Sequence, residues 1–201
     1  MIVISEKDRS LLPGAKKQTM VVGNGVNIPG RYQVTTKKFD ILFLGNFSYM
    51  PNLNAARFLI TRIHPKLYES FPEIRILLAG IDAEKQLNKF RVKNVEVRSN
   101  VKSIIPLFGS SRIFVAPMFM STGIQNKILE AMANGIPVIT TPNAADAIGA
   151  KDCKHLLLAI SEQEFHDQIL RLLIDQVLSE NLVRNAYQLI SENYDWKKTL
   201  S

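Results

Sequence analysis

The feature that most constrains this chain is a regular alternation, from Phe39 onward, of short apolar runs with longer segments of helical period. Each short run is rich in β-forming residues and is bounded by Gly, Pro, Asn, Asp or Ser, which predicts a strand. The predicted strands are Ile41–Leu44, Ile74–Ala79, Val95–Arg98, Ile113–Ala116, Val138–Thr141 and Leu156–Ala159. Strands that alternate with helices favour βα units and a parallel sheet. We therefore predict an α/β protein with a doubly wound, Rossmann-like parallel sheet.

Helical spacing is clearest over residues 52–70, where apolar residues recur at intervals of three and four. Further helices are predicted at residues 83–90, 101–108, 125–134, 161–177 and 179–193. Doubly wound sheets bind ligands at the carboxyl ends of their strands. The loops after Leu44, Arg98 and Ala116 are therefore the expected location of a site.

The opening residues do not continue this alternation. A strand-like Ile2–Ile4, a short helix with Asp8 and Leu11, and a second strand-like Met20–Val22 precede the turn-forming stretch 23–30. A chain of 201 residues can bury one good core or one domain with an appendage. We predict that residues 1–30 are a remnant of another domain plus a linker, and that residues 31–201 form the main domain.

The net charge of +7 favours anionic partners, although scattered lysines fit a solvated surface equally well. No aromatic–basic interleaving supports a nucleic-acid partner, and none is expected.

Cys153 is the single cysteine, which excludes an intrachain disulfide and indicates a reducing compartment. The charged residues directly after Ser5 leave no room for a signal peptide, so we expect a cytoplasmic protein. The three histidines lack metal-ligand spacing, and neither a metal nor a cofactor is expected.

The most informative stretch is residues 121–138, which follows a predicted strand and opens a predicted helix. Thr122 and Gly123 would expose free backbone N–H groups at the helix start, and Lys127 would add a cation, a combination suited to a diphosphate. Glu130, further along the helix, could accept hydrogen bonds from a ribose. The alternative is an ordinary helix cap by Ser121 or Thr122, with Lys127 and Glu130 simply solvated.

The segment GIQNKILEAM at residues 123–132 closely resembles the donor-site signature of the group 1 glycosyltransferases of family 4, which have the GT-B fold. It is most similar to their sugar-transferase branch, with the motif GIQNKxLEAM. Residues 43–52 resemble the first strand and glycine loop of that family's C-terminal domain, and residues 116–118 resemble the strand end before the donor loop. Residues 24–27 resemble the junction between the two domains, and residues 5–8 the closing segment of the N-terminal domain. The resemblance implies the C-terminal half of a GT-B fold.

The same resemblance implies roles for individual residues. Gly45, Asn46 and Phe47 would lie in the loop facing the interdomain cleft, although that loop lacks the Arg and Lys of many relatives. Asn100 and Val101 would lie beside the base, and Glu130 would hold the ribose hydroxyls. The residues expected to approach the diphosphate and sugar are Gly123, Ile124, Gln125, Asn126 and Lys127. Thr122 stands where the common family motif has a glutamate, so the sugar would be held differently, through Thr122, Gln125 or Asn126, or the activity would be altered.

The function implied is binding of a UDP- or GDP-linked sugar for metal-independent transfer to a glycan or lipid-linked acceptor in polysaccharide biosynthesis. Backbone N–H groups and Lys127 would stabilise the phosphate leaving group. The acceptor site and catalytic base would lie on the N-terminal domain, so no catalytic residue is assigned here and little transfer is expected from this chain alone. Peripheral association with the inner membrane face and a homodimer are further expectations. A non-catalytic nucleotide-binding or interaction module is the alternative, whereas a dinucleotide oxidoreductase lacks its G-x-G-x-x-G motif.

Overall fold

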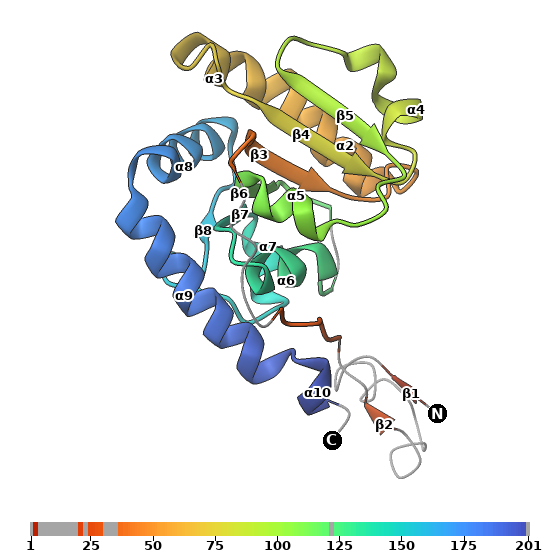
Figure 1. Cartoon of the computed structure of the whole chain (residues 1–201), viewed down its shortest axis with the longest axis vertical. Coiled ribbons are helices and arrows are strands. Elements are labelled where there is room, and N and C mark those ends of the chain that lie inside the picture. Colours follow the sequence, from red (N-terminus) through yellow and green to blue (C-terminus); the bar gives the residue numbers. More distant parts are fainter. Residues whose placement is uncertain (1, 4–19, 22–23, 30–35, 121–122, 200–201) are drawn as a thin grey trace.

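The computed structural model describes residues 2–3, 20–21, 24–29, 36–120 and 123–199. Within these residues, the larger sheet has six parallel strands in the order β5-β4-β3-β6-β7-β8 (Figure 1). The strands are β3 (Phe39–Leu44), β4 (Ile76–Gly80), β5 (Val95–Ser99), β6 (Ser111–Ala116), β7 (Val138–Thr140) and β8 (Leu157–Leu158). Every strand predicted from the sequence is present, with ends displaced by at most two residues. The predicted doubly wound parallel sheet is confirmed.

Strand β3 lies at the centre and pairs with β4 on one side and β6 on the other, with Leu42 opposite Leu77 and Phe114. The chain builds outward from β3 to β5 and then crosses back to β6, where the direction of winding reverses. Ligands of such sheets bind outside the carboxyl ends of the strands at this reversal. The order of the strands thus directs attention to the ends of β3 and β6.

Helices cover both faces of the sheet. They are α2 (Met50–Phe58), the π-helical η2 (Leu59–Ile63), α3 (His64–Ser70), α4 (Ala83–Leu87), the 3₁₀ helix η3 (Asn88–Phe90), α5 (Ile105–Gly109), α6 (Asn126–Ala133), α7 (Pro142–Asp146), α8 (Glu162–Ile174), α9 (Gln176–Asn193) and α10 (Trp196–Thr199). Right-handed crossovers that run in opposite directions from the centre place α2–α3 and α6 on opposite faces. Because β3 is covered on both sides, Ile41, Leu42 and Phe43 are all fully buried, which explains the continuous apolar run. No helix in the described part of the chain is long and apolar enough to cross a membrane.

The helix predicted over residues 52–70 is interrupted by the π-helical turn η2. Pro65, near the start of α3, has no N–H with which to bond the carbonyl group of Thr61, so the regular ladder cannot continue there. Apolar periodicity does not detect this change. Helix α5 begins at Ile105 rather than at residue 101, with Pro106 in its first turn, where proline fits best. Helices α7 and α10 were not predicted.

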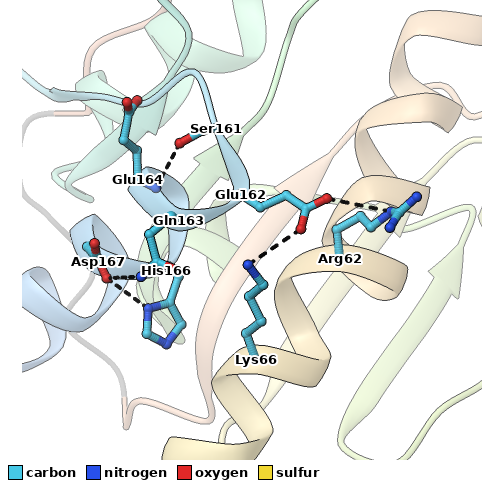
Figure 2. A network of polar contacts seen from close by, with 8 residues as sticks. All are labelled: Arg62, Lys66, Ser161, Glu162, Gln163, Glu164, His166 and Asp167. Atoms are coloured by element: carbon cyan, nitrogen blue, oxygen red, sulfur yellow. Dashed lines mark hydrogen bonds and ion pairs between the residues drawn. The ribbon is translucent and has the colours of Figure 1, made fainter.

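Ion pairs join the start of α8 to the segments η2 and α3 (Figure 2). The Glu162 carboxylate lies 3.7 Å from Arg62 Nε of η2 and 3.5 Å from Lys66 Nζ of α3. The Ser161 hydroxyl accepts a hydrogen bond from the Glu164 backbone N–H at 3.2 Å, which caps α8. The two ion pairs of Glu162 join segments about one hundred residues apart in the sequence.

Near the N-terminus, β1 (Ile2–Val3) and β2 (Met20–Val21) form a separate two-stranded parallel sheet. The predicted short helix with Asp8 and Leu11 lies outside the described residues. The Val26 N–H donates to the Tyr194 carbonyl at 2.8 Å, and a Cβ on Gly25 would come within 2.7 Å of the Trp196 ring. The predicted linker and the last helix therefore lie side by side.

Candidate functional site

A cavity of about 260 Å³ opens at the carboxyl ends of β3, β4 and β5, beside α6. It brings together residues that are far apart in the sequence. The predicted site residues in its wall are Gly45, Asn46, Asn100, Val101, Lys127 and Glu130. Gly80, Ile81 and Ile104 also line the cavity and were not predicted.

The floor of the cavity is formed where two backbones nearly touch. A Cβ on Gly80 would lie only 1.9 Å from the carbonyl oxygen of Gly45, and Gly80 has a φ of +142°. Both the space and the backbone conformation therefore require glycine at position 80. With no side chain at either position, a ligand could approach the ends of β3 and β4 at backbone distance.

Lys127, in the first turn of α6, lines this cavity, and among the described residues its ammonium group contacts neutral groups only. Its Nζ donates to the Asn52 side-chain oxygen and lies 3.6 Å from Met118 Sδ. The same atom is 5.1 Å from the centre of the Phe43 ring, a cation–π contact. Burial lowers the pKa of Lys127 to about 8, because the charged form loses hydration without gaining a carboxylate partner. An anion in the cavity would supply the missing partner.

Glu130 lies one turn beyond Lys127 and also lines the cavity. Burial raises the pKa of the Glu130 carboxyl above its ordinary value. Among the described residues, its carboxylate forms no hydrogen bond or ion pair, so both oxygens can accept hydrogen bonds from a ligand. The cavity therefore has a cationic and an anionic group on one helix, one turn apart.

The loop before α6 differs from the prediction in one respect. Helix α6 begins at Asn126, and its N-cap is Gln125, which makes no side-chain capping bond. The helix start is therefore neither at Thr122 and Gly123, where the diphosphate prediction placed it, nor capped by Ser121 or Thr122, as the alternative had it. Lys127 and Glu130 are both partly buried rather than simply solvated. Thr122 itself lies outside the described residues. Gly123 has a φ of +76°, and a Cβ there would meet nothing within 4 Å.

The other predicted residues lie around this loop rather than in the cavity. Ile124 is half-buried and packs against the core, and Gln125 Nε2 donates to the Gly123 carbonyl at 3.4 Å. Asn126 lines an adjacent hollow, which has Ile104 and Glu130 in common with the cavity and also includes Trp196.

The aromatic cluster near β3 is mostly core. Phe39, Phe43 and Phe47 are buried, and the rings of Phe43 and Phe47 pack edge to face at 6.0 Å. Tyr49 is 53% exposed. The Phe47 ring therefore does not reach the cavity, although its backbone N–H bonds the Ile81 carbonyl and fixes the loop after β3.

Asn52 is a site residue that sequence reasoning missed. It is buried on the first turn of α2, and its side chain contacts both Asn46 and Lys127. The signal was a polar residue within an otherwise apolar helix face directly after the glycine loop. Gly80 was also missed, although a glycine that ends an apolar strand was visible.

A larger cavity, of about 780 Å³, lies at the opposite edge of the sheet, near the junction of α8 and α9. Two of its three cationic side chains, those of Lys37 and Arg112, are already engaged. Lys37 Nζ donates to the carbonyls of Gly109 and Ser111, and the Arg112 guanidinium donates to the carbonyl of Leu173 at 2.7 Å. Size alone therefore does not make it the candidate site.

Comparison with known families gives a match over most of the chain. The family model described as "Glycosyl transferases group 1" matches residues 38–175. This range contains β3 to β8 and every residue of the 260 Å³ cavity named above.

Three individual proteins are similar to the chain. The "Uncharacterized 44.6 kDa protein in cps region" of Klebsiella pneumoniae is 26% identical over 190 residues, covering 87% of this chain and 49% of that protein. Anabaena HepE in complex with UDP-glucose has a TM-score of 0.75 at 16% identity, covering 98% of this chain and 60% of that one. The C-terminal domain of the Francisella tularensis group 1 family protein LpcC has a TM-score of 0.65 at 17% identity, covering 86% of this chain and 100% of that one. The chain thus spans about half the length of its Klebsiella relative.

Proposed function

Because the chain belongs to the group 1 glycosyl transferases, we propose that the cavity at the ends of β3, β4 and β5 binds a nucleotide-sugar donor. The observation that carries this proposal is Lys127, a partly buried cation that, among the described residues, is held at the cavity by neutral groups. A site built in this way is electrostatically incomplete until an anion binds. A diphosphate fits this requirement, and the Anabaena neighbour crystallised with UDP-glucose supports it.

The groups lining the cavity suggest how the donor is divided among them. We assign the base to the wall formed by Asn100 and Val101 and the ribose to the Glu130 carboxylate. The diphosphate then lies between Lys127 and the backbone floor at Gly45 and Gly80. Around Gly123, the open space leaves room for the sugar.

In the transfer reaction, the bond between the anomeric carbon and the phosphate oxygen breaks, and the nucleoside diphosphate leaves with the electron pair. An acceptor hydroxyl oxygen forms the new bond to the anomeric carbon and gives up its proton to a base. Lys127 would stabilise the charge that develops on the leaving phosphate, and the free N–H groups at the start of α6 would contribute to this stabilisation. A positive charge fixed before the reaction needs no reorganisation at the transition state.

We further propose that residues 31–201 form the donor domain of the GIQNKxLEAM branch and that residues 1–30 belong to a linker and a neighbouring domain. The complete coverage of the isolated LpcC C-terminal domain supports this division. The glycan or lipid-linked acceptor and the catalytic base are assigned to that other domain. A role in polysaccharide biosynthesis is supported by the name of the Klebsiella relative, which places that protein in a cps region.

Calorimetric titration with UDP, GDP, UDP-glucose and GDP-mannose tests this function. We expect one nucleotide series to bind and its binding to be lost in Lys127→Ala and in Glu130→Ala. Lys151→Ala is the matched control, because this exposed lysine lies outside the cavity. Absence of binding by every nucleotide, or unchanged affinity in both site variants, would overturn the proposal.

A further inference from the structure

We propose that Asn52 is a positioning residue that holds the Lys127 ammonium group at the cavity and keeps its positive charge available for an anionic ligand. This inference rests on the proposed function and deepens it. It assigns a role to a residue on the first turn of α2, for which the sequence resemblance implies none.

The side-chain amide of Asn52 connects two walls of the cavity. Asn52 is only 6% exposed, and its Nδ2 donates to the Asn46 carbonyl at 2.9 Å. Its Oδ1 accepts from Lys127 Nζ. The orientation of the amide is unambiguous, because a carbonyl group can only accept and an ammonium group can only donate. One side chain thus links the loop after β3 to α6.

The contact between Asn52 and Lys127 is neutral on the Asn52 side, so it leaves the charge of the ammonium group uncompensated. Among the described residues, the other contacts of the Lys127 ammonium are with the Met118 sulfur and the Phe43 ring, and no ion pair joins Lys127 to Glu130. A carboxylate at position 52 would hold the lysine equally well but would cancel its charge. An amide provides the acceptor oxygen and leaves the charge for the ligand.

The packing around Asn52 determines which substitutions are informative. A Cβ on Gly45 would lie 3.0 Å from the Asn52 Cγ, so the amide fits directly against the glycine backbone. Asp has nearly the same size as Asn and adds a charge, whereas Leu keeps the branched shape, with a larger volume, and removes the hydrogen bonding. Asn52→Asp and Asn52→Leu are therefore the variants of choice.

The first readout is the pKa of Lys127 in the ligand-free protein. It is measured by an NMR pH titration of labelled lysine side chains. The wild-type pKa is expected at about 8. Asn52→Asp should raise this pKa by adding a negative partner, whereas Asn52→Leu should lower it further by removing the acceptor. Asn54→Asp, with the same new charge on the same helix and no contact with Lys127, should leave it unchanged.

The second readout is affinity for UDP. At pH 7, Asn52→Asp should bind UDP at least about tenfold more weakly although Lys127 stays charged, because the charge is already paired. Asn52→Leu should retain binding at pH 6.5 and lose it more steeply than wild type by pH 8.5. Asn54→Asp should bind as wild type does.

The two readouts separate this inference from the proposed function. An unchanged Lys127 pKa in Asn52→Asp, or wild-type UDP affinity in that variant, would overturn the role of Asn52. If wild type itself binds no nucleotide, the proposed function fails. The titration of Lys127, which needs no ligand, still decides whether Asn52 controls the lysine.

Discussion

At the scale of single residues, Lys127 lowers the stability of the folded protein but favours the binding of an anion. Its charge is buried among neutral groups, which lowers its pKa from 10.5 to about 8. Each unit of such a shift corresponds to about 1.4 kcal/mol between the two protonation states. The proposed function accounts for this cost, because the same uncompensated charge would attract a diphosphate.

Replacing this lysine should therefore stabilise the protein. We expect Lys127→Met to raise the free energy of unfolding by about 2 kcal/mol at pH 7, because a buried charge is removed. Unfolded lysine retains its proton up to about pH 10.5 and folded Lys127 only to about 8, so wild-type stability rises with pH between these values. The advantage of the variant should shrink over that window. Urea unfolding at pH 7 and pH 10 measures this, with exposed Lys151→Met as control; a variant less stable than wild type at pH 7 would refute it.

A second prediction for a single residue concerns the stability of a Gly80 variant. Gly80→Ala combines a forbidden backbone conformation with a Cβ that would lie 1.9 Å from the Gly45 carbonyl. We expect a loss above about 3 kcal/mol in thermal unfolding. The control is Gly149→Ala, where φ is +64° and the space is open, so the loss should stay near 1–2 kcal/mol, about the cost of left-handed backbone alone. Equal losses in the two variants would contradict the close approach of the two strands.

Six of the residues singled out by the family resemblance line the cavity, including Asn100 and Val101 outside the donor motif, whereas the contact between Asn52 and Lys127 was missed. Lys127 and Glu130 belong to one recognisable segment, and both line the cavity. Asn52 was missed because its partner, Lys127, is 75 positions away. No local pattern predicts a contact of that length.

At the scale of elements, the sequence predicts the strands better than the helix ends. A buried parallel strand is a compact apolar run with turn residues on both sides, and this pattern located all six strands of the large sheet. Helix ends depend on details such as Pro65 and Pro106, which apolar periodicity ignores. Helix α6 likewise begins three residues after Gly123, which moves its free N–H groups toward Lys127.

The start of α8 tests the energetics of one such helix end. Ser161→Ala should lower stability by about 1 kcal/mol, because the cap to the Glu164 N–H is lost. Glu162→Gln should cost less than about 0.5 kcal/mol, because its pairs with Arg62 and Lys66 are exposed to water. Urea unfolding in low and high salt distinguishes the two, since only the second loss should disappear in salt. A larger loss for Glu162→Gln would show that the ion pairs, rather than the cap, fix α8.

At the scale of the whole molecule, the site depends on the strand order. Residues 45, 80, 100 and 127 meet because β3, β4 and β5 end at one edge and α6 follows the crossover to β6. Large apolar side chains are exposed on loops at this edge, including Tyr49 at 53%, Ile81 at 56% and Met120 at 67%. Such a surface is suited to contact with a further domain.

This arrangement leads us to expect that the chain alone binds a nucleoside diphosphate but transfers little sugar. The test is product formation from a UDP- or GDP-sugar with candidate acceptors, measured under conditions where donor binding is saturated. Robust transfer would contradict the assignment of the acceptor site to another domain. If a two-domain relative that carries this same segment binds the nucleotide sugar but transfers no sugar, a non-catalytic nucleotide-binding role is favoured instead.

The most direct test of the central claim is an NMR titration of the labelled protein with UDP, which locates the bound ligand residue by residue. The amide signals of Gly45, Gly80, Asn100 and Lys127, around the 260 Å³ cavity, should shift together and saturate. Those of Lys37, Arg112 and Arg184, at the larger cavity on the opposite edge, should stay in place. Shifts confined to the larger cavity, or no saturable shift at all, would contradict a donor site at the ends of β3, β4 and β5.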